Sequence, residues 1–179
     1  MMIETERLLL KPFCKDDLGI IYQLYSDEEI MRYMPNEYMD WEMAERHLDK
    51  IVQAWDATPL IDREMLVLDK HSGEKIGRCH IHLDPDTDSA MIGWLLLQKD
   101  WGKGYATEIT KALMHQAFDS LQVRRVCALC HPDNIASWRV LEKCGMRREA
   151  HYKEKCRYIK HGLVSWQDEL EYAILKTEQ

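Results

Sequence analysis

The amino-acid sequence predicts an α+β fold centred on a twisted, mixed sheet of largely antiparallel strands. Two observations predict it. The chain has 179 residues, the size of one ordinary domain, so we expect a single domain over residues 1–179. Apolar residues recur with helical spacing in some segments and alternate with polar residues, as in half-buried strands, in others. Together these segments predict about seven strands and about four flanking helices.

The N-terminal part of the chain predicts one strand followed by helices. Residues 5–13 are typical of a strand and residues 16–25 of a helix. The cluster Ser26-Asp27-Glu28-Glu29 predicts the start of a second, short helix that ends near Pro35. Residues 41–55 carry apolar side chains at positions 41, 44, 48, 51, 52 and 55, which is the spacing of an amphipathic helix.

The middle of the chain predicts three successive strands separated by turns. These strands are expected at residues 64–68, 75–83 and 90–97.

The C-terminal half mixes helices and strands. A helix opens at Tyr105, with apolar positions at 105, 106, 109, 112, 113 and 117. A strand is expected at 123–129, and a helix at 134–143 that Gly145 stops. The alternating segments 146–158 and 163–175 then predict a hairpin around Lys160-His161-Gly162.

Charge and composition exclude several classes of protein. The chain has 31 acidic and 24 basic residues and a net charge of −7, which argues against a general nucleic-acid binder. A cationic substrate such as an amine remains open. The first residues do not form an export signal, and no apolar stretch approaches the ~18 residues of a membrane helix. We therefore expect a cytoplasmic protein with no membrane partner, whose six cysteines are reduced core residues.

One short cysteine–histidine motif has the spacing of a haem site, although other features of the sequence argue against haem. Cys127-Ala128-Leu129-Cys130-His131 has the spacing of a c-type haem attachment site. Haem attachment follows export, and residues three apart on a strand point to opposite faces. The pair could also be half a zinc site, for which Cys79-His80-Ile81-His82 is the only plausible second half. We expect neither haem nor a metal.

The segment between a predicted strand and the helix at Tyr105 is the strongest chemical signal. Gly102 and Gly104 form a glycine loop before a helix N-terminus, an arrangement that can turn backbone N–H groups toward a phosphate. It is not a Walker loop, and Thr107 stands where the dinucleotide fingerprint needs a third glycine. Two glycines alone also fit an ordinary strand-to-helix turn.

Four blocks in order give the chain a recognisable resemblance. It resembles the GCN5-related N-acetyltransferase (GNAT) superfamily, and more closely its RimJ/RimL-type branch, which includes acetylases of ribosomal-protein N-termini. The blocks are Ile3 to Phe13, Ile92-Gly93-Trp94 with Trp101 to Glu108, Asn134 to Met146, and Trp166-Gln167-Asp168 before Tyr172 to Leu175.

The resemblance implies an acyl-CoA donor, a primary-amine acceptor and direct acetyl transfer in a ternary complex. The family's loop pattern falls on Trp101, Gly104 and Ala106, with Trp101 departing from it at the first position. In the family the preceding strand splays from its neighbour and pairs with pantetheine, and a later helix lies beside the pantetheine and the sulfur. The implied coenzyme-binding residues are Trp94, Leu95, Leu96, Trp101, Gly102, Lys103, Gly104, Tyr105, Ala106, Thr107, Asn134 and Ser137.

The catalytic residues are less defined than the coenzyme loop. Many family members use a tyrosine as the general acid, and here that position is Leu141. Ser137 is the substitute we expect, against the alternative of an ordinary helix serine. A chain without an efficient acid could also be a CoA-binding module with little transferase activity.

Strand alternation offers two carboxylates as bases. Glu154 and Asp168 each fall on the more apolar face of a C-terminal strand, where desolvation would raise the carboxyl pKa. The alternatives are an ion pair with an arginine or a bulge that turns the side chain outward. His80 and His82 share a strand face and could line the acceptor cleft, but we expect them at the surface.

The acceptor would contact the loops around residues 35–41 and the hairpin near Gly162, and it could be a small amine or a protein N-terminus. Members of the family are often dimers, so a homodimer is a further expectation, although no symmetric interface can be read from the sequence.

Overall fold

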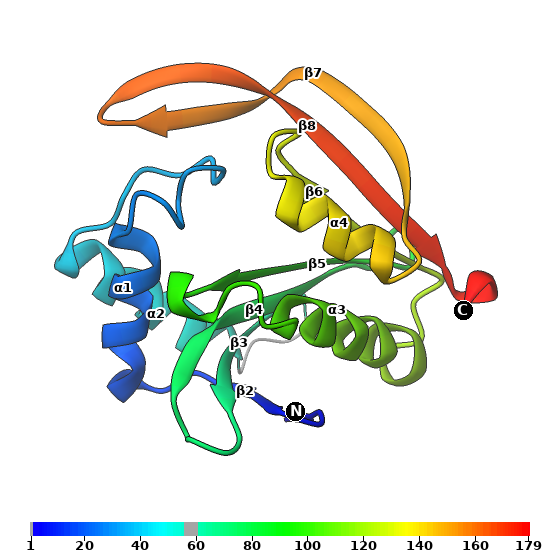
Figure 1. Cartoon of the computed structure of the whole chain (residues 1–179), viewed down its shortest axis with the longest axis horizontal. Helices are drawn as coiled ribbons and strands as arrows, with labels where there is room; N and C mark the ends of the chain where they lie inside the picture. The colour runs from blue at the N-terminus through cyan, green and yellow to red at the C-terminus, as the bar shows by residue number, and fades with distance from the viewer. Residues whose placement is uncertain (1, 56–60) are drawn as a thin grey trace.

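The computed structural model describes residues 2–55 and 61–179 and contains one mixed sheet flanked by helices on both faces (Figure 1). The sheet has eight strands in the order β1-β2-β3-β4-β5-β6-β8-β7. Among the strands that the structure describes, β5–β6 is the one parallel pair and the rest are antiparallel, so the predicted α+β fold is confirmed. The strands are β1 (Ile3–Glu4), β2 (Leu8–Pro12), β3 (Asp62–Asp69), β4 (Lys75–Asp84), β5 (Ser89–Leu96), β6 (Arg125–Cys130), β7 (Arg147–Lys160) and β8 (Leu163–Leu175).

The eighth strand, β1, lies before the first predicted strand, which corresponds to β2, and the two strands form a small hairpin. The Thr5 backbone N–H donates to the Leu8 carbonyl, and the Thr5 hydroxyl accepts the Leu8 N–H. This tight turn folds β1 back on β2, with Ile3 opposite Leu10.

Four α-helices flank the sheet: α1 (Leu18–Ser26), α2 (Trp41–Trp55), α3 (Tyr105–His115) and α4 (Ile135–Lys143). Short helical turns at Lys15–Asp17, Gln98–Asp100, Gln116–Ser120 and Lys176–Glu178 extend or connect these elements. The predicted α2 has the observed bounds, and its buried positions Ala44, Leu48 and Ile51 follow the predicted spacing.

The short helix predicted to begin near Ser26 and end near Pro35 is wrong. This segment forms consecutive turns in which the Asp27 carboxylate accepts the N–H groups of Glu29 and Ile30. It buries Ile30 and Met31, which are neighbours in the sequence. The Arg32 and Met34 N–H groups bond to carbonyls three residues back, so the chain forms turns and not a continuous α-helical ladder.

The helices divide the core into two layers. α3 and α4 pack with Met65, Val67 and Ile109 on one face of the sheet. α1 and α2 pack with Leu66 and Leu95 on the other face. β3 is thus buried on both sides, which explains its continuous apolar run. Within the described residues, no helix is long and apolar enough to cross a membrane.

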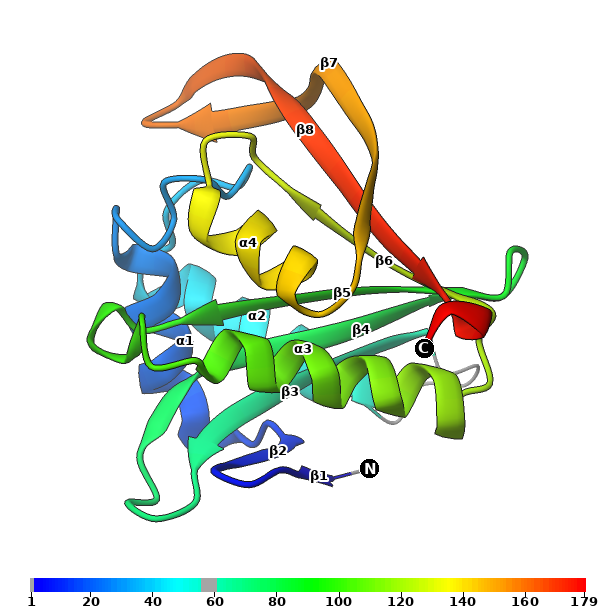
Figure 2. The ribbon, with the colours of Figure 1, turned by 45° about the vertical axis from the view of Figure 1, so that its right-hand side comes forward.

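The sheet splits between β5 and β6. In the part of the chain that the structure describes, their pairing joins only Ser89–Met91 to Arg125–Cys127. Beyond this point β5 continues against β4, whereas β6 continues against β8, and the two arms diverge (Figure 2). The expected splay is therefore present, and the backbone of residues 92–96 lines the opening on the β5 side.

Candidate active site

A glycine loop connects the open end of β5 to α3. Gly102 has φ +72° and Gly104 has φ +82°, so both lie in the left-handed region that favours glycine. A Cβ at Gly102 would meet no atom within 4 Å. The backbone conformation, and not a lack of space, therefore requires glycine there.

The loop delivers unpaired backbone donors to the start of α3. Gly104 is the N-cap residue, and the Glu108 N–H bonds back to the Gly104 carbonyl at 3.2 Å. By helix geometry, the N–H groups of Tyr105, Ala106 and Thr107 precede the first intrahelical bond and point out of the helix end. Their dipoles and the helix macrodipole favour an anion at this position.

Two side chains of the loop are already engaged. The Trp101 indole N–H donates to the Leu96 carbonyl at 2.8 Å, although the ring is 45% exposed. The Lys103 ammonium forms an ion pair with Asp100 at 2.9 Å, and this hydrogen bond raises the pKa of Lys103. Trp101 thus anchors the loop to the end of β5, and the loop's anion-binding capacity resides mainly in backbone groups.

The other residues that the resemblance assigned to the coenzyme belong to β5 and to the start of α4, the helix that lies between the two diverging arms (Figure 2). Trp94, Leu95 and Leu96 lie on β5 beyond its pairing with β6. The Asn134 side chain caps α4 by accepting the Ser137 N–H at 3.2 Å. The half-buried Ser137 makes no side-chain hydrogen bond to the described residues, so its hydroxyl is available.

The expected environment of Glu154 is wrong. It is exposed and lies at an irregularity in the β7–β8 register between Tyr152 and Cys156, with φ +45°. The bulge interrupts the alternation on which the burial prediction depended.

The expected environment of Asp168 is also wrong. Its carboxylate accepts hydrogen bonds from the Lys153 ammonium at 2.7 Å and from the Glu154 N–H at 3.0 Å, and it contacts the His151 ring. The Lys153 hydrogen bond, followed by those from Glu154 and His151, holds the pKa of Asp168 well below its usual range. Desolvation is outweighed, so the carboxyl is ionised at neutral pH and engaged by a cation.

Comparison with known proteins decides the family. Residues 7–147 match the family model described as an acetyltransferase (GNAT) domain. This chain belongs to the GNAT family. It is 34% identical over 179 residues to YnaD of Bacillus subtilis, an uncharacterized N-acetyltransferase, and the match covers 99% of each chain. The GNAT protein described here is accordingly an acyl-CoA-dependent N-acetyltransferase.

Solved structures agree on the fold. A GNAT acetyltransferase from Bacillus anthracis is 30% identical, with a TM-score of 0.87 over 99% of this chain and 100% of the other. Spermidine N-acetyltransferase from Vibrio cholerae, solved with CoA and spermine, has a TM-score of 0.82 at 21% identity, covering 97% of this chain and 98% of that one. A RimL ribosomal L7/L12 acetyltransferase, solved with CoA, also has a TM-score of 0.82, at 18% identity, covering 98% of both. The last two show the fold alone, so the RimJ/RimL-type branch is not singled out.

The α4 helix of this GNAT protein carries no proton donor at the position where a tyrosine was sought. Leu141 is 1% exposed and belongs to the core that α3 and α4 share with the sheet. Ser137, one turn earlier, is the residue of this helix that combines a hydroxyl with partial exposure.

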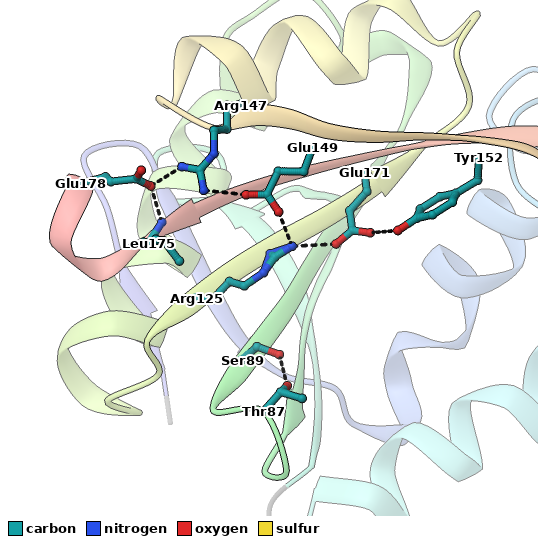
Figure 3. A network of polar contacts seen from close by, with 9 residues as sticks. All are labelled: Thr87, Ser89, Arg125, Arg147, Glu149, Tyr152, Glu171, Leu175 and Glu178. Atoms are coloured by element: carbon teal, nitrogen blue, oxygen red, sulfur yellow. Dashed lines mark hydrogen bonds and ion pairs between the residues drawn. The ribbon is translucent and has the colours of Figure 1, made fainter.

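Sequence reasoning missed a charged network on the opposite face of β8 from Asp168. Glu171 accepts the Tyr152 hydroxyl at 2.6 Å and Arg125 at 2.7 Å (Figure 3). Arg125 also binds Glu149 at 2.8 Å, and the network continues through Arg147. Glu171 lies opposite Leu129, just beyond the point where β5 and β6 separate. Polar residues alternate along this face at 165, 167, 169 and 171, but the pattern does not show that Glu171 pairs with Arg125 and Tyr152 on the neighbouring strands.

His80 also departs from its surface prediction. Its ring lies across Gly93 on β5, where an added Cβ would come within 2.4 Å of the ring. Burial, with a smaller effect of the neighbouring Arg78, lowers the pKa of His80 to about 3. His82 is half-exposed and bonds to Asp62, in agreement with a surface position.

The loops expected to contact an acceptor meet one another. The Glu37 carboxylate accepts the N–H groups of His161 at 3.0 Å and Gly162 at 2.8 Å. The Ile159 N–H donates to the Pro35 carbonyl at 3.0 Å. Hydrogen bonds therefore join the α1–α2 connection to the tip of the β7–β8 hairpin, and the two segments lie beside each other (Figure 1).

All six cysteines are unpaired thiols. Among residues 2–55 and 61–179, no group of three or more His, Cys, Asp or Glu side chains is arranged to hold a metal ion.

Proposed function

We propose that this protein binds acetyl-CoA with the pyrophosphate on the backbone amides of residues 102–107 and transfers the acetyl group to a primary amine in a ternary complex. The observation that carries the proposal is the left-handed glycine loop, which leads from the splayed end of β5 into the unpaired N–H groups of α3. A diphosphate suits this position because several aligned donors and the helix dipole favour negative charge there.

The pantetheine arm would follow the opening of the sheet. Backbone groups of Trp94, Leu95 and Leu96 lie on the β5 edge that β6 leaves, and an extended amide chain can pair with such an edge. Asn134 and Ser137 belong to the start of α4, the helix that lies between the two diverging arms (Figure 2).

The chemistry requires three proton and charge movements. The amine nitrogen attacks the thioester carbonyl carbon and gives up a proton to water, the carbonyl oxygen gains negative charge, and the C=O bond re-forms as the C–S bond breaks and the sulfur takes a proton. We assign the last proton to Ser137, whose hydroxyl is uncommitted. Neither Asp168 nor Glu154 has been tested as a catalytic group. The hydrogen bonds of the Asp168 carboxylate support a structural role for it. The exposed Glu154 side chain supports neither a structural nor a catalytic role.

The acceptor class follows from charge and from the neighbours' names. A net charge of −7 favours a cationic amine. One neighbour is named for spermidine and another for a ribosomal-protein N-terminus, so both acceptor types belong in the test. We infer further that the protein belongs to a RimJ/RimL-like branch, that it is cytoplasmic with reduced thiols, and that it forms a homodimer. We also infer one domain over residues 1–179, because a single sheet includes strands from Ile3 to Leu175.

The test is an acetyl-CoA turnover screen over polyamines, amino acids, aminoglycosides and N-terminal peptides, read by the mass of the acetylated product. We expect at least one amine to gain an acetyl group and to accelerate CoA release. Tight CoA binding with no acetylated amine would support a CoA-binding module instead. Absence of micromolar binding of both CoA and acetyl-CoA would contradict the proposed site.

A further inference from the structure

Arg7 contacts the glycine loop from the far end of the sequence. It lies in the turn between β1 and β2, and its Nη1 donates to the Lys103 carbonyl at 2.9 Å. Its Nε donates to the Glu108 carboxylate at 2.7 Å, and Nη2 pairs with the same carboxylate at 2.7 Å. The guanidinium also lies 4.6 Å from the Tyr105 ring centroid. One side chain thus engages both the loop and the first turn of α3.

The bond to the Lys103 carbonyl sets the orientation of the next amide. In a trans peptide the C=O and N–H point in opposite directions. With the Lys103 oxygen held toward Arg7, the Gly104 N–H points to the other side. Because glycine tolerates either sign of φ, Gly104 itself does little to prevent the Lys103–Gly104 peptide from flipping. Arg7 supplies the restriction.

Arg7 also neutralises a carboxylate beside the loop. Glu108 is mostly buried in the first turn of α3, and its other oxygen accepts the Thr5 hydroxyl and the Arg7 N–H. Although desolvation opposes it, these hydrogen bonds and Arg7 hold the pKa of Glu108 below its usual value. An unpaired Glu108 would therefore present a full negative charge close to any anion on the helix end.

We propose that Arg7 is a positioning residue for the coenzyme diphosphate, acting by fixing the Lys103–Gly104 peptide and by neutralising Glu108. The inference rests on the proposed function. It adds a residue outside the loop and helix motif, held there by the N-terminal hairpin.

The experiment compares Arg7→Met and Arg7→Lys with the wild type by calorimetric titration with CoA and by steady-state kinetics. Loss of a charge-assisted hydrogen bond and exposure of a like charge predict an increase of about 10- to 100-fold in the CoA Kd and in the acetyl-CoA KM for Arg7→Met. The value of kcat at saturating acetyl-CoA should stay within about twofold. Arg7→Lys keeps the charge without the planar fork and should lie between the two.

A double variant separates positioning from general stability. Glu108→Gln in the Arg7→Met background removes the unpaired charge and should recover part of the lost CoA affinity. Arg46→Met is the matched control, because Arg46 is an exposed arginine of α2 paired with Glu42 at 2.6 Å. It should leave CoA binding unchanged.

The outcomes are distinguishable. If the wild type binds CoA and Arg7→Met binds it within twofold, or if kcat falls while KM is unchanged, the role of Arg7 is wrong and the proposed function stands. If Arg7→Met fails to fold, Arg7→Lys carries the comparison, and a normal CoA Kd and acetyl-CoA KM in that variant would overturn the inference. If the wild type does not bind CoA, the proposed function and this inference both fail.

Discussion

The carboxylate of Asp168 lies 2.7 Å from the Lys153 ammonium on the adjacent strand of the β7–β8 hairpin. The Glu154 N–H and His151 complete its surroundings, and together they lower the pKa of Asp168. A group whose folded-state pKa is lowered stabilises the fold fully above its unfolded-state pKa, about 3.9 for aspartate. That stabilisation is lost as the pH falls from this value toward the folded-state pKa.

Asp168→Asn should therefore lower Tm near neutral pH, and the difference from the wild type should shrink below about pH 4. Its kcat should change by no more than a few-fold, because the carboxylate is already occupied by a cation. Thermal unfolding and pH–rate profiles check both statements. Asp86→Asn, in the exposed β4–β5 turn, is the control. A large fall in kcat with loss of the acidic limb of the profile would instead assign Asp168 to proton transfer.

Gly104→Ala should weaken CoA binding by at least tenfold. Its φ of +82° is strained for alanine, and the new Cβ would lie 3.5 Å from the Arg7 guanidinium. Gly73→Ala is a matched control, since Gly73 has φ +72° and open space around it but lies in the β3–β4 turn. Both variants should lose about 1–2 kcal/mol of stability, and only Gly104→Ala should lose affinity. Equal CoA affinities would remove the loop from the coenzyme site.

Ser137→Ala should reduce kcat by about 100-fold, the scale of a general acid, with little change in Tm or in the acetyl-CoA KM. Tm should change little because the Ser137 hydroxyl makes no hydrogen bond to the described residues. Ser165→Ala, at an exposed position of β8, is the control. An unchanged kcat would mean that the sulfur takes its proton from another group or from water.

Asn134→Ala should destabilise the protein by about 1 kcal/mol through loss of the α4 cap, which lowers Tm by about 2–4 °C. Asn134→Asp keeps an oxygen that can accept the Ser137 N–H and should retain most of the stability. Thermal unfolding of the two variants checks the cap. If Asn134→Ala has the wild-type Tm, the cap does not stabilise α4.

The parts of the fold that sequence predicted well are those governed by local periodicity. The apolar stripe Ala44, Leu48 and Ile51 predicted α2, and the alternating segments on either side of Gly162 predicted the β7–β8 hairpin. The failures have non-local causes. Between Tyr152 and Cys156, three residues of β7 face the single residue Asp168 of β8, and this bulge interrupts the alternation and leaves Glu154 exposed to solvent.

The same limit applies to the site. The glycine loop was predicted because its signal lies in a few adjacent residues. The environment of Asp168 depends on the strand paired with it, and the burial of His80 depends on its packing against Gly93. Arg7 meets Lys103 across 96 residues of sequence, and only the folded chain brings the two together.

The most direct test of the central claim is an amide ¹H–¹⁵N spectrum of the protein titrated with CoA and, separately, with pantetheine, which lacks the diphosphate. The account predicts that CoA shifts the Gly104, Tyr105, Ala106 and Thr107 amides strongly and that pantetheine leaves them nearly unchanged. Acetyl transfer that proceeds while CoA leaves these four amides unshifted would contradict it.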